Sequence, residues 1–167
     1  VPVGGGGLAA GIAIAAKSII PSIKIYGIEP TGAASMKNAF EKGAPAPLSI
    51  VKSFADGVAV RKVGKNSYDI CRNYLDDIFT VDDDETAAAI LWMMENHKIM
   101  MEGAGALPIA AFINDKLNRF SKNTVAVASG GNIDVKMVSR IIERGLIKTG
   151  RRTTLKTIVS DRPGELS

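Results

Sequence analysis

The sequence predicts an α/β fold: a doubly wound, mostly parallel sheet with helices on both faces. Apolar runs typical of strands alternate with helical patterns along the chain. In addition, three glycine-bearing turns each join an extended run to a helix, at residues 4–7, 103–105 and 130–131. Strand–helix–strand units of this kind require parallel pairing. In such sheets ligands bind at the carboxyl ends of the strands, where these turns lie.

The first half of the chain contains two extended runs and three helical segments. Their order is an extended start at 1–3, a helix to about 18 that ends before Pro21, a strand at 23–28, a helix at 33–42, extended chain at 44–51, a turn at Asp56-Gly57, and a helix at 67–75 with Ser67 as its cap. This order gives one strand–helix–strand unit followed by a second helical layer.

The second half repeats the alternation. A strand at 77–81 leads to a helix that begins in the acidic run at 82–85, where negative charge complements the helix dipole, and that ends near His97. We expect Ala88, Leu91, Trp92 and Met94 to face the core. A helix at about 102–116, a strand at 124–128, and a helix capped by Asn132, with Asp134 in its first turn and Gly145 at its end, complete the pattern.

Composition indicates one globular domain with no membrane segment and no nucleic-acid partner. The chain has 167 residues, 46% hydrophobic and 23% charged, and its longest apolar run, at 8–16, is too short to span a bilayer. The net charge of +4 comes from basic residues at 136–156 that lack interleaved aromatic residues, which favours a solvated helix face. The single Cys71 excludes an internal disulfide and, without a signal peptide, indicates a cytoplasmic protein.

Two residues with reactive side chains are interpreted as structural. Cys71 has no histidine or second cysteine near it in sequence, so we expect a buried thiol on the inner face of its helix. His97 is the only histidine and ends a helix, where a solvated imidazole is the ordinary arrangement. We therefore expect neither residue to do chemistry.

The four consecutive glycines, Gly4 to Gly7, predict an anion site. Without Cβ atoms the backbone can adopt positive φ and approach a ligand, and the helix that follows presents free N–H groups with the positive end of its dipole. Leu8 and Ala9 stand where a Walker loop needs lysine and serine or threonine. Gly5, Gly7 and Ala10 also match the dinucleotide fingerprint, with Glu29 placed as the ribose-binding acid, so an NAD- or FAD-dependent oxidoreductase stays open.

Four motifs taken together resemble the fold-type II pyridoxal-phosphate enzymes, which have a tryptophan synthase β-like domain, and among them the threonine ammonia-lyases. The motifs are Pro2-Val3-Gly4-Gly5-Gly6-Gly7-Leu8, Ala55-Asp56-Gly57, Glu102-Gly103-Ala104-Gly105-Ala106 and Ser129-Gly130-Gly131-Asn132. The resemblance covers residues 1–147. Serine racemase and serine dehydratase share the pattern, so it identifies the family more firmly than the substrate.

The resemblance implies a cofactor, pyridoxal 5'-phosphate, and a reaction, the dehydration and deamination of L-threonine or L-serine to 2-oxobutanoate or pyruvate and ammonia. It also implies that Gly4, Gly5, Gly6, Gly7 and Leu8 hold the cofactor phosphate. Ser129, next to Gly130, would contact the pyridine nitrogen, and Gly57 and Glu102 would lie beside the ring and the substrate. A neutral hydroxyl at that nitrogen suits β-elimination, because the ring need not hold a lasting carbanion.

The sequence departs from the family pattern in two ways. The family's Schiff-base lysine and substrate-carboxylate loop precede the tetraglycine loop, so no lysine here is assigned to catalysis, and we expect a fragment that is inactive alone. The family's cation site maps to Glu29, Ala33 and Ser35, where serine replaces a second acid. A divalent ion is therefore less expected there than a monovalent one.

The last twenty residues, 148–167, form a linker and then resemble the start of an ACT domain, a small-molecule regulatory module, truncated at Ser167. The expected partners are a small amino-acid substrate (threonine or serine), an amino-acid effector at this region, and further copies of the chain in a homo-oligomer. Besides the dinucleotide oxidoreductase and serine racemase, a non-catalytic ligand-binding fragment is the remaining alternative.

Overall fold

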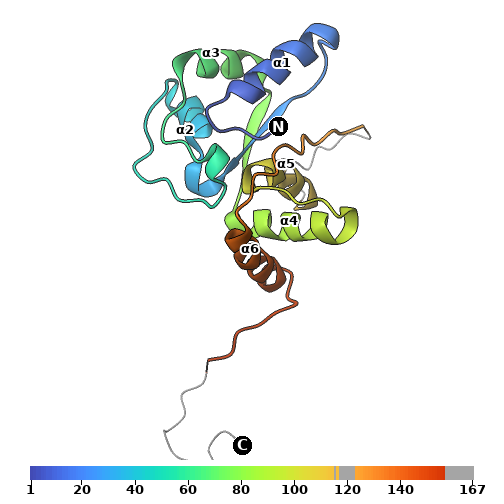
Figure 1. The fold of residues 1–167 in the computed structure, drawn as a ribbon. Coiled ribbons are helices and arrows are strands. Elements are labelled where there is room, and N and C mark those ends of the chain that lie inside the picture. Colours follow the sequence, from blue (N-terminus) through green and yellow to red (C-terminus); the bar gives the residue numbers. More distant parts are fainter. Residues whose placement is uncertain (115, 117–122, 157–167) are drawn as a thin grey trace, which may run out of the picture.

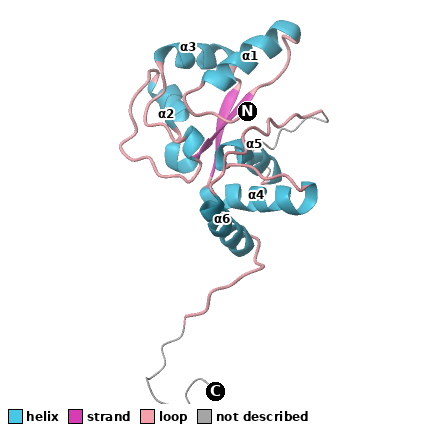
Figure 2. Ribbon diagram, viewed as in Figure 1, coloured by secondary structure: helices cyan, strands magenta, loops and turns pink. Residues whose placement is uncertain are grey.

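The computed structural model describes residues 1–114, 116 and 123–156 (Figures 1 and 2). Helices alternate with two short strands, as predicted. In chain order the elements are α1 (Gly7–Ile19), β1 (Tyr26–Pro30), the 3-10 turn η1 (Thr31–Ala33), α2 (Ser35–Lys42), the 3-10 turn η2 (Asp56–Val58), α3 (Lys65–Tyr74), β2 (Asp77–Val81), α4 (Asp83–His97), α5 (Gly103–Ile113) and α6 (Val135–Lys148). The ACT-like run at 157–166 lies outside the described residues.

The strands pair in parallel, which confirms the predicted topology. In β1 and β2, Tyr26 lies opposite Asp77, and the register continues to Pro30 opposite Val81. The start of the chain lies on the other side of β1, where Pro2 forms a parallel bridge with Ile28. The amide of Val3 donates to the carbonyl of Ile28 at 2.9 Å. All three extended segments therefore run parallel, and the tetraglycine loop begins where the first of them ends.

Helices cover both faces of this sheet (Figure 2). On one face, Ile78 packs with Val3 and with apolar residues of α1, α2 and α3. On the other face, Ile28 and Val81 pack with the buried side of α5, including Leu107. Gly27 allows this close packing, because a Cβ there would lie 2.9 Å from Val3 Cγ2. The arrangement is the two-layer covering predicted from the alternating pattern.

Helices α4, α5 and α6 form a second group beside the sheet (Figure 1). Ile90, Ile141 and Ala106, one from each helix, share a single buried cluster. Gly145 lies inside α6, where a Cβ would come within 3.1 Å of Leu91 Cβ. The prediction that Gly145 ends this helix is therefore wrong, because its lack of a side chain serves helix packing instead of a helix end.

Local signals misplaced three further features. Of the residues expected to face the core from α4, Leu91 is buried and Met94 packs against the core, but Trp92 is 41% exposed. Helix α3 begins at Lys65 and Ser67 lies within it, because Gly64 already has the extended backbone of a helix cap. The cap of α6 is Asp134, whose carboxylate accepts from the amide of Lys136 at 2.8 Å, and Asn132 lies before it.

Residues 124–128 do not form the expected strand. They are extended, but Val125 is 88% exposed, and in the described part of the chain no strand lies beside them. Alternating apolar residues predict a strand only where a neighbouring strand supplies the hydrogen-bond ladder.

In the described part of the chain, no helix has the length and apolar character needed to cross a membrane.

The acidic run lies at the start of α4, as predicted, and the structure shows that it forms a capping box. Asp82 accepts from the amide of Glu85 at 2.7 Å, and Glu85 accepts from the amide of Asp82 at 2.8 Å. We predict that Asp82→Ala lowers the free energy of unfolding by about 1 kcal/mol, because a helix N–H loses its partner. Urea unfolding measures this, with Asp82→Asn as the matched control that keeps a cap oxygen. Equal losses in both variants would contradict the role of the cap.

Candidate cofactor site

The tetraglycine loop ends in an open helix N-terminus. Gly6 has φ +90°, a left-handed conformation that favours glycine, and it caps α1 without any side-chain hydrogen bond. The first intrahelical bond is donated by Ala10 to the carbonyl of Gly6, at 2.8 Å. The amides of Gly7 and Leu8 precede that bond, and both residues are exposed. These two amides form the N-terminal end of α1, which carries the positive end of the helix dipole. Since α1 has neither a side-chain cap nor an acid in its first turn, this end suits an anion.

The second motif lies against the first. A Cβ on Gly4 would lie 2.8 Å from the Cα of Val58, so the tetraglycine loop and η2 touch backbone to backbone. On its other side η2 approaches the start of α5, where a Cβ on Gly57 would lie 3.2 Å from Ala104 Cβ and 3.5 Å from Glu102 Oε1. The segment 55–58 is therefore held between the tetraglycine loop and the start of α5, which carries the third motif.

The fourth motif lies against the third. A Cβ on Gly105 would overlap the carbonyl oxygen of Ser129, and a Cβ on Gly130 would overlap the carboxylate of Glu102. Gly130 also has φ +82°, which a side chain rarely adopts. The amide of Glu102 donates to the carbonyl of Gly130 at 3.4 Å. The structure thus brings all four motifs into one contiguous site, although up to 125 residues separate them in sequence (Gly4 to Ser129).

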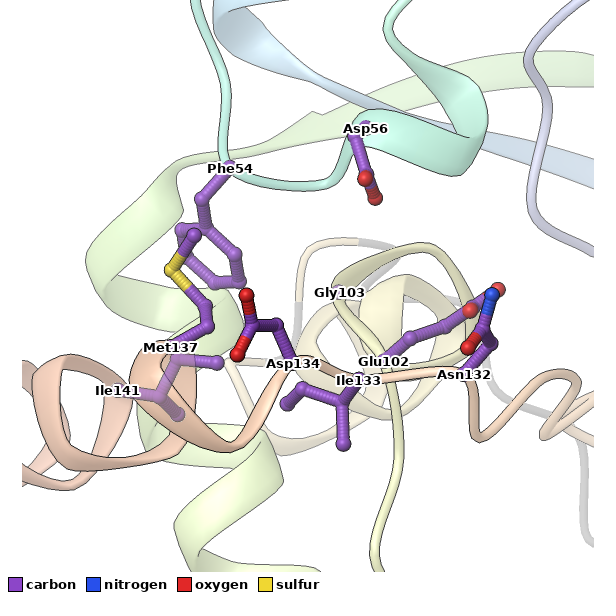
Figure 3. A pocket seen from close by; sticks show the side chains of 9 residues that line it. All are labelled: Phe54, Asp56, Glu102, Gly103, Asn132, Ile133, Asp134, Met137 and Ile141. Carbon is purple, nitrogen blue, oxygen red and sulfur yellow. The ribbon is translucent and has the colours of Figure 1, made fainter.

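A pocket lies where η2, α5 and α6 meet (Figure 3). Figure 3 shows the Asp56 carboxylate reaching in from η2 and the Glu102 side chain lying beside Asn132. The pocket has an apolar wall and a polar mouth, and none of the described residues that line it is a lysine. Its lining residues are Phe54, Asp56, Glu102, Gly103, Asn132, Ile133, Asp134, Met137 and Ile141. The sequence did not indicate Phe54 or Met137, although Phe54 directly precedes the Ala55-Asp56-Gly57 motif.

The residues assigned to a cation lie together at the start of α2, away from this pocket. Glu29 is fully buried, and its carboxylate accepts from the amides of Met36 and Lys37, both at 2.8 Å. Burial raises the pKa of Glu29 to about 7, although those two amides lower it. Ser35 is also buried and its Oγ has no hydrogen-bond partner, and Ala33 is buried in η1. Within the described residues no cluster of three or more acids, histidines or cysteines could hold a metal.

Cys71 is a buried thiol, as expected. It lies in α3 behind the tetraglycine loop, and its Sγ donates a long 3.7 Å hydrogen bond to the carbonyl of Gly6. Burial and the charge of Glu29 raise the pKa of Cys71 to about 11, so the thiol stays protonated near neutral pH. His97 is exposed at the end of α4, and its ring lies 4.8 Å from that of Trp92.

Comparison with known proteins identifies the class. Residues 1–130 match the family model described as pyridoxal-phosphate dependent enzyme, so the chain belongs to this family and its cofactor is pyridoxal phosphate. The site fits that cofactor. The uncapped end of α1 suits its phosphate, and the pocket is bordered by Asp56, Glu102 and Asn132, one residue from each of the other three motifs.

Several similar proteins are named as threonine ammonia-lyases or threonine deaminases. The chain is 43% identical to the L-threonine ammonia-lyase of Geobacter sulfurreducens over 167 residues, and 42% identical to that of Thermotoga maritima over 166 residues. These matches cover 100% and 99% of this chain but 42% and 41% of the relatives. The processed form of threonine deaminase isoform 2 from Solanum lycopersicum superposes with a TM-score of 0.80 at 40% identity, covering 86% of this chain and 42% of that one.

The dinucleotide interpretation is wrong. Besides the family match, the carboxylate of Glu29 is fully buried and bound to the amides of α2. A ribose-binding acid must present its oxygens to the ligand outside the strand end. The local spacing of Gly5, Gly7 and Ala10 fits both families, because both place an anion at a helix N-terminus.

The close approach of α5 to the Ser129 turn gives a prediction. Gly105→Ala should displace the turn, because its methyl group would overlap the Ser129 carbonyl, and pyridoxal phosphate should bind at least roughly tenfold more weakly. Gly11→Ala is the matched control. Nothing lies within 4 Å of a Cβ there, so this variant should bind normally and gain up to about 1 kcal/mol of helix stability. Normal cofactor affinity in Gly105→Ala would show that the turn does not form part of the site.

The raised pKa of Glu29 gives a pH prediction. Its protonated form is favoured by folding, so its contribution to stability is present below its ordinary pKa of 4.5 and is lost as the pH rises through about 7. Relative to Glu29→Gln, wild type should therefore lose unfolding free energy between pH 4.5 and 7. The Gln variant adds a constant penalty, because its NH₂ faces a backbone amide. Urea unfolding at several pH values tests this, and a difference that is flat or grows with pH would oppose it.

Proposed function

We propose that this chain forms the cofactor-binding part of a threonine ammonia-lyase. The enzyme removes water from L-threonine to leave an enamine, and a water molecule then hydrolyses the imine tautomer of that enamine to 2-oxobutanoate and ammonia. L-serine gives pyruvate and ammonia in the same way. The observation that carries the proposal is the packing of four glycine-bearing motifs against one another, in a chain that is 43% identical to an L-threonine ammonia-lyase. Since the chain spans less than half of that relative, the activity belongs to the whole protein that carries it.

The phosphate is held by Gly4 to Gly7 and Leu8. The amides of Gly7 and Leu8 donate to it, and its charge takes the place of a capping side chain at the uncapped end of α1. Gly6 supplies the left-handed turn that aims these donors. The tetraglycine loop needs no charged side chain for this task, because helix dipole and amides together stabilise the dianion.

Ser129 and Gly130 hold the other end of the cofactor. Ser129 is half-buried at the turn before α6, and its hydroxyl donates to the pyridine nitrogen. The bound cofactor draws electron density from the Cα of the substrate, which permits loss of the β-hydroxyl. A hydroxyl neither carries charge nor fixes a proton on that nitrogen, so Ser129 holds the ring in place without strengthening it as an electron sink.

Glu102 acts on the substrate side of the cavity. Its carboxylate lies close to Gly57 and Gly130 at once, so it stands between the two motifs that border the ring. Since it lines the open pocket, it can orient the ammonium group of an amino acid or exchange a proton with solvent. Gly57 leaves the approach to this carboxylate free of any side chain.

Other parts of the protein complete the enzyme. The Schiff-base lysine comes from the part of the enzyme that precedes the tetraglycine loop in the family pattern. Residues 1–147 belong to the catalytic domain, and residues 148–167 begin an ACT-like domain where an amino-acid effector binds.

A monovalent or divalent cation at Glu29, Ala33 and Ser35 would give the Ser35 hydroxyl a partner. The protein assembles as a cytoplasmic homo-oligomer.

The role of Ser129 gives the test of the proposed function. In the protein that carries this chain, Ser129→Ala should weaken pyridoxal-phosphate binding several-fold, since it removes a hydrogen bond worth about 0.5–1.5 kcal/mol. The fold should persist, because only a hydroxyl is lost. Equilibrium dialysis against the cofactor measures the loss of binding, and keto-acid release from L-threonine measures the activity that depends on it.

Ser18→Ala is the control, since its exposed hydroxyl bonds only the carbonyl of Ala15 at the far end of α1. It should match wild type in both assays. If Ser129→Ala binds the cofactor as tightly as wild type does, Ser129 does not contact the ring. If wild type releases no keto acid from L-threonine or L-serine, the ammonia-lyase activity itself is wrong.

A further inference from the structure

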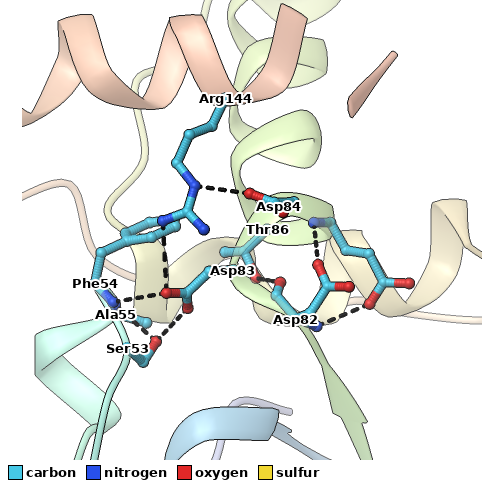
Figure 4. Close-up of polar contacts among 9 residues, drawn as sticks. Ser53, Phe54, Ala55, Asp82, Asp83, Asp84, Thr86 and Arg144 are labelled. Carbon is cyan, nitrogen blue, oxygen red and sulfur yellow. Dashed lines mark hydrogen bonds and ion pairs between the residues drawn. The ribbon is translucent and has the colours of Figure 1, made fainter. Parts of the chain in front are cut away.

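One carboxylate at the start of α4 holds three consecutive residues of the segment that enters the site (Figure 4). The hydroxyl of Ser53 donates to Asp83 Oδ1 at 2.6 Å, and the amide of Phe54 approaches Asp83 Oδ2 at 3.3 Å. Ser53 Oγ in turn accepts from the amide of Ala55 at 3.1 Å. Asp83 thus fixes the backbone of 53–55, partly through the serine hydroxyl.

The segment held in this way borders the cofactor cavity. Ala55 is fully buried, and its Cα lies 2.8 Å from where a Cβ on Gly103 would stand. Three residues further on, Val58 makes the equally close contact with Gly4. Gly57 lies between these two contacts. A shift at Ser53 therefore reaches Gly57 over a few tightly packed residues, with little room for the chain to absorb it.

Arg144 of α6 joins the same network. Its guanidinium lies 3.7 Å from Asp83 Oδ2 and 5.7 Å from the centre of the Phe54 ring, and its Nε donates to Asp84 at 2.7 Å. Helix α6 directly follows the Ser129 turn. Asp83 and Arg144 therefore connect the segment beside the ring with the helix behind the Ser129 turn (Figure 4).

A simpler role exists for an acid at this position, since any carboxylate in the first turn of a helix stabilises its dipole. Asp84 separates the two roles. It lies in the same turn and pairs with the same Arg144, but 51% of its side chain is exposed, whereas the figure for Asp83 is 22%. Asp83 alone of this pair reaches the 53–55 segment through the bonds described above.

We propose that Asp83 is a positioning residue for the cofactor site: through Ser53 and Phe54 it sets the position of Gly57 beside the ring. The inference rests on the proposed function for its catalytic consequence, and on the family's cofactor for its binding consequence. Asp83 touches neither cofactor nor substrate, so it acts only through the segment that it holds.

The test compares Asp83→Ala with Asp84→Ala in the protein that carries this chain. Both should lose helix stability in urea, since each removes one first-turn acid, and Asp83→Ala should lose more, because Ser53 and Phe54 lose their acceptor. The dissociation constant for pyridoxal phosphate, measured by equilibrium dialysis under conditions where both variants are folded, should rise roughly tenfold in Asp83→Ala and less than about twofold in Asp84→Ala. Equal cofactor affinity in the two folded variants would overturn the positioning role.

Variants of Ser53 test the same path with a smaller change. Ser53→Ala should weaken cofactor binding, and Ser53→Thr should restore it, because threonine keeps the hydroxyl. The double variant Asp83→Ala/Ser53→Ala should bind no worse than Asp83→Ala, since the two residues act as one unit. Additive losses, or no rescue by threonine, would overturn the proposal. A wild-type protein that fails to bind pyridoxal phosphate would instead overturn the assigned cofactor site, whatever the Asp83 variants do.

Discussion

The site depends on backbone approaching backbone at three places where no Cβ can fit. Gly4 lies against Val58, Gly103 against Ala55, and Gly105 against the carbonyl of Ser129. Close packing of this kind transmits displacement, because a dense interior has few voids to absorb it. The position of each turn is therefore set by its neighbour, and the pocket beside the turns is lined by side chains that include Phe54, Glu102 and Met137.

The helix N-termini show how the chain reserves one end for a ligand. Asp82 caps α4 and Asp134 caps α6, so those ends are satisfied within the protein. Helix α1 has no side-chain cap and no acid in its first turn. Helices α3 and α5 also lack a side-chain cap and a first-turn acid, so the end of α1 is distinguished by the left-handed Gly6 before it and by the exposed residues Gly7 and Leu8.

Much of the fold and site could be predicted because the signals are local or repeated. Alternation of strand and helix patterns indicated the parallel sheet, and the glycine turns indicated the loops that meet. The sequence could not show that residues 124–128 lack a neighbouring strand, or that Gly145 serves the packing of α6 on α4, since both depend on distant segments. The bond from Ser53 to Asp83, thirty residues apart, was hidden for the same reason.

An experimental structure of the protein with pyridoxal phosphate bound tests the central claim most directly. We expect the phosphate oxygens within about 2.7–3.2 Å of the amides of Gly7 and Leu8, with Ser129 Oγ at a similar distance from the pyridine nitrogen. Gly57 and Glu102 should border the ring. A phosphate bound away from the start of α1, or a ring nitrogen facing any residue other than Ser129, would contradict the account.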